Sequence, residues 1–396
     1  MLLKNASVLN GVFAFSNLDI EVNNGKIDNL YIQNEYNTTN HDEVLDLSGY
    51  RILPGFIDIH THGCAGYDTM DATYEALNNM SRFMAMNGVT SFLPTTMSET
   101  YQSIKNAFLN IRNTIDKGVE GADIVGIHME GPYFSKQYKG AQNEKFLRLP
   151  SITDVTELQE LSGRNIRIIS IAPEIDGAME FIKEVSKDNI VISLAHTGAD
   201  YDTALKAIEY GAKHATHLFN GMAGLNHRAP GIIGAVLDSG LSVELICDGI
   251  HLHPAIIRLV YKLAGADKIV LISDSMRAAG LKDDKYDLGG QEIIVKDGVA
   301  RTKDGNIAGS TVTLLQCLKK VVEFGIRLED AVKMVTINPA KVIGVDKYKG
   351  SIQQGKDADL VVINDRFEVV YTFVKGKVVI GHSPIHHKDL RAPCNA

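Results

Sequence analysis

The sequence predicts an α/β protein, a (β/α)8 TIM-type barrel with a small β-sandwich domain built from both chain ends. Three observations carry this prediction: apolar stretches alternate with helical stretches through the middle of the chain, short strands recur at both ends, and polar side chains follow the apolar stretches. Parallel strands that are covered on both faces read as near-continuous apolar runs. Eight strand–helix units in about 250 to 300 residues are typical of this barrel.

The middle of the chain supplies the strands that such a barrel needs. They are expected at 52–60, 89–95, 124–130, 166–172, 190–196, 215–219, 243–247 and 269–273. Apolar residues at helical spacing lie between many of them, at 74–86, 100–115, 178–185, 202–210 and 254–263. Residues 53–349 are therefore expected to form the barrel.

The two chain ends carry a different pattern. Residues 1–52 contain short runs of alternating apolar and polar residues separated by Asn-Gly turns, and residues 350–385 contain a matching set. Such runs predict antiparallel strands. Because neither set is large enough to close a core alone, we expect the two ends to combine into one small β domain, followed by a tail at 386–396.

Composition and charge exclude several classes of partner. The 396 residues are 45% apolar and 22% charged, which is ordinary for a globular protein. The net charge is −8 and no long basic block is present, so no nucleic-acid partner is expected. The chain shows neither an apolar signal region nor a run long enough to span a membrane, which predicts a cytoplasmic protein without a membrane partner.

Polar residues gather where the predicted barrel strands end. The first strand ends in His60 and His62, the third in Glu130, the fifth in His196, the sixth in His217 and the eighth in Asp274. Active sites of barrels are built at the carboxyl ends of the strands. A His-x-His pair alone is often a pair of hydrogen-bonded structural histidines, but the gathering on several strands favours a metal site.

The donors in this set are imidazoles and carboxylates without a thiolate. The cysteines are scattered without the paired spacing of a disulfide framework or a zinc site, and Cys64 is interpreted as a small buried filler rather than a nucleophile. Nitrogen and oxygen donors suit Zn²⁺, Fe²⁺ or Mn²⁺. One metal or two are both possible, because the donors exceed one tetrahedral site, and Glu130 is placed to bridge two.

The chemistry expected of this set is hydrolysis. A divalent metal lowers the pKa of bound water toward about 7. A carboxylate is still needed to take the proton of the water and return it to a leaving group. Asp274 is the candidate for this general base.

Seven short motifs follow one another along the chain. In order, they are H-G-C-A-G-Y-D at 62–68, H-M-E-G-P-Y at 128–133, L-A-H-T at 194–197, A-T-H-L-F-N-G-M at 215–222, H-R-A-P-G at 227–231, D-G-I-H at 248–251 and S-D at 273–274. Taken together, they resemble the N-acetylglucosamine-6-phosphate deacetylase family of the amidohydrolase superfamily. The resemblance covers residues 54–340, and it implies deacetylation of N-acetylglucosamine 6-phosphate to glucosamine 6-phosphate and acetate. The alternatives are an N-acetylgalactosamine-6-phosphate deacetylase or an amidohydrolase acting on a different amide.

The resemblance also implies roles for single residues. Glu130, His196 and His217 match the principal metal ligands of the family, and His60 and His62 match a second site that only some members retain. His251 matches the histidine that polarises the amide carbonyl of the substrate, with a solvated loop histidine as the simpler alternative. Asp274 matches the general base, and two metals per subunit are plausible.

Substrate contacts follow from the same resemblance. Asn220 and Gly221 resemble the contacts to the substrate phosphate, and His227 with Arg228 resembles a loop that reaches the phosphate of the neighbouring subunit. This loop implies a homodimer. A planar guanidinium suits phosphate because it offers two parallel hydrogen bonds.

Two segments leave alternatives open, and one absence is informative. Gln142 stands where the family loop Lys-Gly-Ala-His has its histidine, which puts its contact with a sugar hydroxyl in doubt. The segment Ile307–Thr311, with Ala308 and Gly309, resembles a loop against the sugar, but capping of a helix by Ser310 explains it equally well. The fourth strand has no lysine to bridge two metals, which disfavours a dihydroorotase-like or urease-like enzyme.

Overall fold

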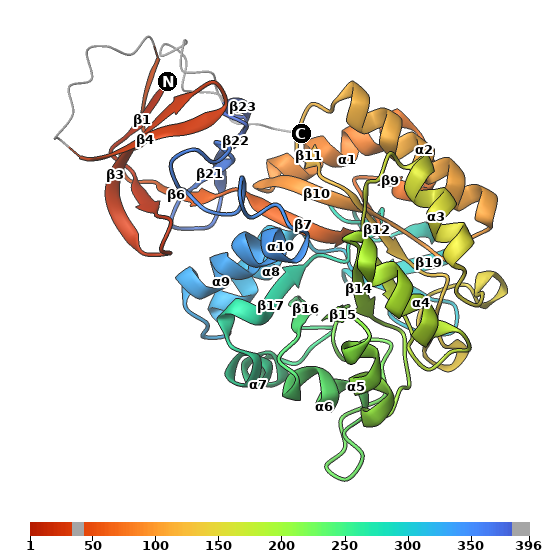
Figure 1. Cartoon of the computed structure of the whole chain (residues 1–396). Coiled ribbons are helices and arrows are strands. Elements are labelled where there is room, and N and C mark those ends of the chain that lie inside the picture. The colour runs from red at the N-terminus through yellow and green to blue at the C-terminus, as the bar shows by residue number, and fades with distance from the viewer. Residues whose placement is uncertain (34–42, 382–396) are drawn as a thin grey trace.

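The computed structural model describes residues 1–33 and 43–381, and it shows a barrel with a sheet domain beside it (Figure 1). The predicted tail at 386–396 lies outside the described residues. Within the described part of the chain, no helix is both long enough and apolar enough to cross a membrane.

The barrel is built from eight parallel strands within the described residues. They are β7 (Phe56–Thr61), β10 (Val89–Thr96), β12 (Ile127–Glu130), β13 (Ile166–Ile171), β14 (Val191–Leu194), β15 (Ala212–Ala215), β16 (Ser242–Ile246) and β17 (Ile269–Ile272). A short β11 (Asp123–Ile124) also pairs with β10. The first and last strands meet where the Asp274 N–H donates to the His60 carbonyl at 2.9 Å and Thr61 bridges Ser275. The predicted barrel is confirmed.

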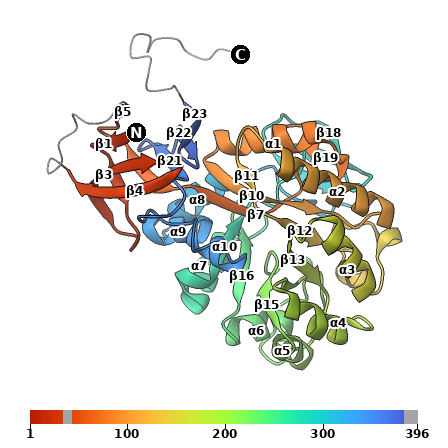
Figure 2. The same cartoon turned by 45° about the horizontal axis from the view of Figure 1, so that its top comes forward.

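Helices cover the outside of the barrel (Figure 2). They are α1 (Tyr74–Met86), α2 (Tyr101–Lys117), α3 (Ile152–Leu161), α4 (Ala178–Val185), α5 (Tyr201–Glu209), α6 (Gly231–Asp238), α7 (Pro254–Ala264), α8 (Leu314–Glu323), α9 (Leu328–Val335) and α10 (Ile337–Val342). In α1, Leu77, Met80 and Met84 recur at helical spacing and join the same apolar core as Phe92 of β10. This one-sided burial is what holds an amphipathic helix against a sheet.

Strands from both chain ends form one nine-stranded sheet. Its members are β1 (Leu2–Lys4), β2 (Ser7–Leu9), β3 (Phe15–Asn23), β4 (Lys26–Ile32), β5 (Val44–Asp46), β6 (Arg51–Pro54), β21 (Leu360–Ile363), β22 (Val369–Val374) and β23 (Lys377–Ile380). Leu360 and Val362 of β21 pack in the core of this sheet, whereas Val361 and Ile363 pack with the barrel core. Because successive side chains of a strand point to opposite faces, one apolar strand serves both cores.

The predicted first strand at 52–60 is divided at Gly55. Its first part is β6, in the nine-stranded sheet, and its second part is β7, in the barrel. A Cβ atom at Gly55 would lie 2.2 Å from Thr90 Oγ1 of the neighbouring strand, so only glycine fits here. The change of sheet therefore depends on a close backbone approach that an apolar run does not reveal.

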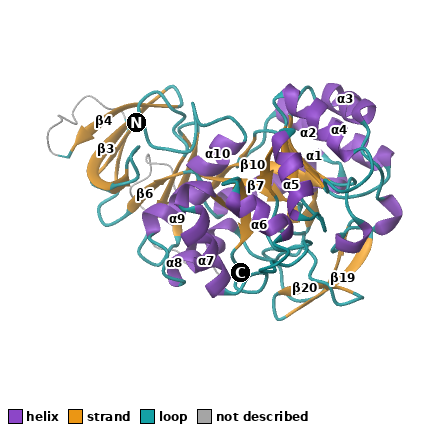
Figure 3. Cartoon of the chain, turned by 60° about the horizontal axis from the view of Figure 1, so that its bottom comes forward, coloured by secondary structure: helices purple, strands orange, loops and turns teal. Residues whose placement is uncertain are grey.

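Two short elements lie beside the main strands. A hairpin of β8 (Gly63–Cys64) and β9 (Tyr67–Asp68) follows β7. Between β17 and α8, a separate sheet consists of β18 (Lys285–Leu288), β19 (Gln291–Lys296) and β20 (Val299–Thr302), which lies at the barrel, away from the nine-stranded sheet (Figure 3). The sequence interpretation did not predict this sheet, although Leu288 reaches the cavity described below.

Candidate active site

The six predicted donors meet at one end of the barrel. His60 and His62 lie at the end of β7 and Glu130 is the last residue of β12, while His196, His217 and Asp274 each follow the end of a strand by two residues. Every one of these side chains is buried, with at most 7% of the residue exposed. The carboxyl ends of the strands thus converge on one polar cluster.

Glu130 lies at the centre of this cluster. Its Oε1 atom is 3.0 Å from His217 Nε2, 3.2 Å from His196 Nε2 and 3.6 Å from His60 Nε2. Its Oε2 atom is 3.3 Å from His62 Nε2. One carboxylate therefore faces all four imidazoles.

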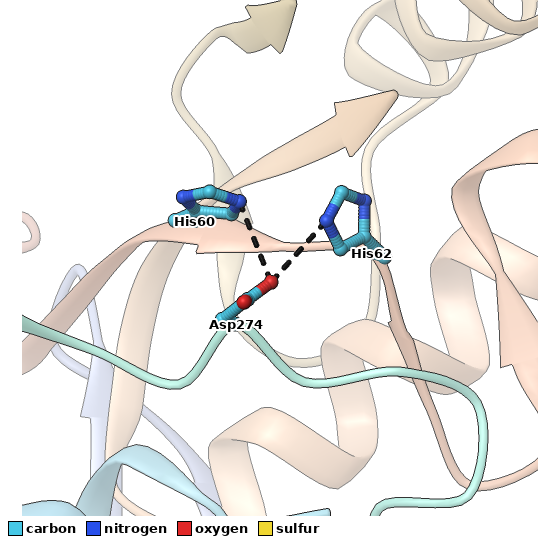
Figure 4. A group of neighbouring side chains, drawn as sticks. All are labelled: His60, His62 and Asp274. Carbon is cyan, nitrogen blue, oxygen red and sulfur yellow. Dashed lines mark ion pairs between the residues drawn. The ribbon is translucent and has the colours of Figure 1, made fainter. Parts of the chain in front are cut away.

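Asp274 faces the histidine pair from the turn that follows β17. Its Oδ1 atom is 3.5 Å from His60 Nε2 and 3.3 Å from His62 Nε2, and both imidazoles point toward it (Figure 4). The donors thus form two groups with metal-ligating spacing. These are His60, His62 and Asp274, and Glu130, His196 and His217.

Three of the imidazoles are oriented through their Nδ1 atoms. The oxygen acceptors are Glu244 for His60 at 2.9 Å, the Tyr138 carbonyl for His196 at 2.9 Å and the Thr95 carbonyl for His62 at 3.3 Å. With the proton on Nδ1, the lone pair of Nε2 faces the carboxylates. His60 Nε2 is buried without a hydrogen-bond partner. A cation between these nitrogen and oxygen atoms fits the cluster, and the absence of thiolates suits Zn²⁺, Fe²⁺ or Mn²⁺.

The charges in the cluster shift its pKa values. Burial lowers the pKa of His60, but the carboxylates of Glu244, Asp274 and Glu130 outweigh burial and raise this pKa to about 9. Burial raises the pKa of Asp274, yet His60 and His62 hold it below its ordinary value. Asp274 is therefore ionised at neutral pH, as a proton acceptor must be.

Three residues of the cluster have left-handed backbones. The φ angles are +46° for His196, +27° for His217 and +46° for Asp274. Such a conformation costs a non-glycine residue about 1 to 3 kcal/mol and is retained where the surroundings impose it, often at functional sites. The turns after β14, β15 and β17 thus carry strain that aims these side chains into the cluster.

A cavity of about 270 Å³ opens over the cluster. Of the remaining predicted site residues, those that line it are Gln142, Asn220, Gly221, His251 and Gly309. Ala308 is fully buried, and its N–H donates to the Ala300 carbonyl at 3.1 Å. His227 and Arg228 are exposed on the loop that projects from the barrel before α6 (Figure 1), outside the cavity of their own chain.

Comparison with known proteins decides the family. The model of the amidohydrolase family matches residues 51–379. The chain belongs to the amidohydrolase family. The amidohydrolase superfamily that the motifs indicated is thereby confirmed. Amidohydrolases are typically metal-dependent, which agrees with the two groups of potential ligands.

Individual relatives of this amidohydrolase indicate which enzymes of the family it resembles. It is 37% identical to the N-acetylglucosamine-6-phosphate deacetylase of Vibrio furnissii, over 87% of this chain and 86% of that protein. It is 36% identical to the N-acetylgalactosamine-6-phosphate deacetylase of Escherichia coli O157:H7, over 83% and 87% of the two chains. The crystal structure of N-acetylglucosamine-6-phosphate deacetylase from Pasteurella multocida superposes with a TM-score of 0.90 at 32% identity, covering 95% of this chain and 98% of that one.

Gln142 of this amidohydrolase is bound to the metal-ligand cluster. Its Nε2 donates to Glu130 Oε2 at 2.7 Å, and its Oε1 accepts the Ser98 N–H at 2.8 Å. The amide is thus oriented by one backbone donor and holds one oxygen of the central carboxylate. Contact of Gln142 with a sugar hydroxyl, which the sequence left in doubt, would have to share these atoms.

The segment Ile307–Thr311 does not cap α8. The helix begins at Leu314 and Thr313 caps it, with a reciprocal bond to Gln316. Ser310 instead donates its hydroxyl to the Ser273 carbonyl and its N–H to the Asp274 carbonyl. Capping by Ser310 is therefore wrong, and the segment supports the strained turn at Asp274.

Two acidic residues, one on the seventh barrel strand and one just after it, were given no role in the sequence interpretation. Glu244 lies inside β16 and contacts His60, and Asp248 follows β16 by two residues and accepts the Nδ1–H of His251 at 2.6 Å. Burial raises the pKa of Asp248, but the bond from His251 keeps it below its ordinary value. The signal was available, because Asp248 has the same offset from its strand as His196, His217 and Asp274.

Proposed function

We propose that this amidohydrolase hydrolyses the acetamide of N-acetylglucosamine 6-phosphate and releases glucosamine 6-phosphate and acetate. The observation that carries the proposal is the contact of Glu130 with four imidazoles at the base of a cavity, with Asp274 beside them. The names of the relatives supply the substrate.

Glu130, His196 and His217 would hold one divalent ion, and His60, His62 and Asp274 would hold a second. Glu130 is placed between the groups and would bridge them. When bound, the metal acts as a Lewis acid that lowers the pKa of water and polarises a carbonyl oxygen. Zn²⁺, Fe²⁺ and Mn²⁺ all suit these donors.

Asp274 would move the proton. Its pKa lies below the ordinary value, so the carboxylate is ready to accept a proton from the attacking water. An amine leaves readily only when it is protonated, and the same carboxyl group can carry the proton to the amide nitrogen. Asp274 thus acts first as base and then as acid.

His251 would polarise the acetamide carbonyl. Its Nδ1–H is held by Asp248 at 2.6 Å, which leaves Nε2 for the cavity that His251 lines. In the imidazolium form, Nε2–H donates to the carbonyl oxygen and stabilises the negative charge that develops there.

The substrate phosphate would be bound by a second subunit. Among the described residues that line the cavity, Asn220 and Gly221 can donate hydrogen bonds, but no lysine or arginine is present. Arg228 Nη1 donates to His227 Nε2 at 2.8 Å, which makes an ordered pair on the projecting loop. A homodimer in which this loop enters the neighbouring cavity would supply the missing cation.

The cytoplasmic location of the protein stays a prediction from the sequence.

Replacing Arg228 with Ala is expected to lower kcat/KM for the phosphorylated substrate about 10- to 100-fold, because a hydrogen bond to a charged group contributes about 1.5 to 3 kcal/mol. Hydrolysis of N-acetylglucosamine itself should not change. The matched control is Arg112→Ala on the exposed face of α2. Equal losses on both substrates would contradict a phosphate contact.

Mixed dimers test the exchange of loops directly. A dimer of one Arg228→Ala chain and one Asp274→Asn chain contains one site with both defects and one site with neither, if the loop crosses to the partner. Purified mixed dimers should then show about half of the parent activity, and random exchange of subunits between the two impaired proteins should give about a quarter of it. Activity no higher than the mean of the two variants would place the loop over its own site.

A second candidate substrate is N-acetylgalactosamine 6-phosphate. Gln142 departs from the family loop, and a relative named for this substrate is 36% identical. Acetate release from the two phosphosugars, measured side by side with metal content, decides between them. We expect higher kcat/KM for the glucosamine derivative, and a preference for the galactosamine derivative would replace the first proposal.

A further inference from the structure

Glu244 is a buried carboxylate that the reaction outlined above does not use. It lies in the middle of β16, between Val243 and Leu245, and is fully buried. An ionised carboxylate without partners is very costly in such a position. Its partners therefore indicate why the charge is there.

Those partners belong to both groups of potential metal ligands. Glu244 Oε2 lies 2.9 Å from His60 Nδ1 and accepts the backbone N–H of His217 at 3.1 Å. Oε1 lies 3.3 Å from His214 Nε2, and the main-chain carbonyl of Glu244 accepts the N–H of Leu218 at 2.9 Å. A single oxygen thus touches the imidazole of one group and the backbone of the other.

We propose that Glu244 is the positioning residue that holds both halves of the metal centre, an inference that rests on the metal-dependent reaction proposed above. Accepting the proton-bearing Nδ1 of His60 fixes the tautomer that aims Nε2 at the ligand cluster, and it fixes the orientation of the ring. Mutation of a carboxylate that orients a metal-ligating histidine in this way typically weakens metal binding about 10- to 100-fold.

Glu244 also holds the backbone at His217. Its φ of +27° is strained for a residue with a side chain. The amides of His217 and Leu218 both donate to Glu244, one to its side chain and one to its main chain. These paired bonds hold the turn after β15 in the conformation that directs His217 Nε2 to Glu130.

A direct metal site at Glu244 is the competing interpretation, since His60, His128 and Glu244 also have metal-ligating spacing. Both nitrogens of His128 are engaged, with the Ile59 carbonyl at 3.0 Å and the Ser170 hydroxyl at 2.8 Å. His60 Nδ1 already carries the proton shared with Glu244. Glu244 therefore affects metal binding indirectly, by positioning the residues that would hold the metal.

The experiment measures metal affinity of the full chain. Metal is removed with chelator, and Zn²⁺ binding is measured by competition with a chromophoric chelator for the parent, Glu244→Gln and Glu244→Leu. Glu244→Gln keeps the shape but loses the charge, and we expect about tenfold weaker binding; Glu244→Leu loses both bonds, and we expect about 100-fold weaker binding. Co²⁺-substituted protein should show an altered visible spectrum in both variants.

His214→Asn is the matched control. It removes the partner of Glu244 Oε1 but leaves the bonds to His60 and His217, so metal affinity should stay at the parent value. Thermal unfolding of the metal-free variants separates folding from metal binding. Parent-like Zn²⁺ affinity in Glu244→Gln, or an equal loss in His214→Asn, would overturn the inference.

The two proposals fail separately. A parent protein that binds Zn²⁺ but releases no acetate from either phosphosugar refutes the proposed function, while weakened binding in Glu244→Gln would still support the positioning role. Acetate release by the parent together with unchanged Zn²⁺ affinity in Glu244→Gln refutes the positioning role alone.

Discussion

Replacement of Asp274 with Asn is expected to lower kcat about 10²- to 10⁴-fold, the range for loss of one positioned general base. The amide keeps the size of the side chain but cannot accept the proton of water at neutral pH. Initial rates of acetate release from N-acetylglucosamine 6-phosphate measure the effect. A metal bound by Glu130, His196 and His217, as proposed, should remain, because Asp274 contacts the His60 and His62 group.

Two further measurements separate loss of the base from loss of the metal. Metal content, determined in the same samples, shows whether the rate falls at constant occupancy of the Glu130 group. Asp116→Asn, at an exposed position of α2, is the control for the same chemical change outside the site. An Asp274→Asn protein that turns over as fast as the parent would assign the proton transfer to another group.

The fold was predictable because its pattern is local. Most barrel strands coincide with predicted apolar runs, and the helices α1 and α4 have the bounds that their periodicity indicates. The sixth strand was placed wrongly at 215–219, because β15 (Ala212–Ala215) contains Lys213 and His214 and does not read as an apolar run. The division at Gly55 was not predictable, since it depends on contact with Thr90 of the neighbouring strand. The sheet of β18, β19 and β20 was missed because its strands interrupt the strand–helix alternation on which the barrel prediction relied.

The site followed a positional rule that the sequence analysis applied only in part. His196, His217 and Asp274 were found because they follow apolar runs, and Asp248 obeys the same rule but was assigned no role. Glu244 was overlooked because it interrupts an apolar strand, and the residues next to it in the sequence do not indicate a role for its charge. Its significance arises from His60, which is 184 positions away in sequence.

Removal of the metal is expected to abolish acetate release almost completely. Without a Lewis acid, the pKa of water returns from about 7 to about 15.7, which no single residue of the site can offset. The chain is dialysed against chelator, its metal content is measured, and Zn²⁺, Fe²⁺ or Mn²⁺ is added back. We expect activity to recover with the restored metal, and full activity at less than one tenth of an equivalent would contradict the metal-dependent reaction.

The pH dependence of metal binding tests whether the ion enters the cluster of histidines and carboxylates. In the metal-free protein, burial lowers the pKa of His60, but the carboxylates around it raise that pKa to about 9. A metal must therefore displace a proton below this pH, so its affinity should fall as pH decreases from about 9, about tenfold per pH unit for each proton released. Titration calorimetry in two buffers of different ionisation enthalpy counts these protons. Binding that releases none at pH 7 would mean that the ion does not enter among these histidines.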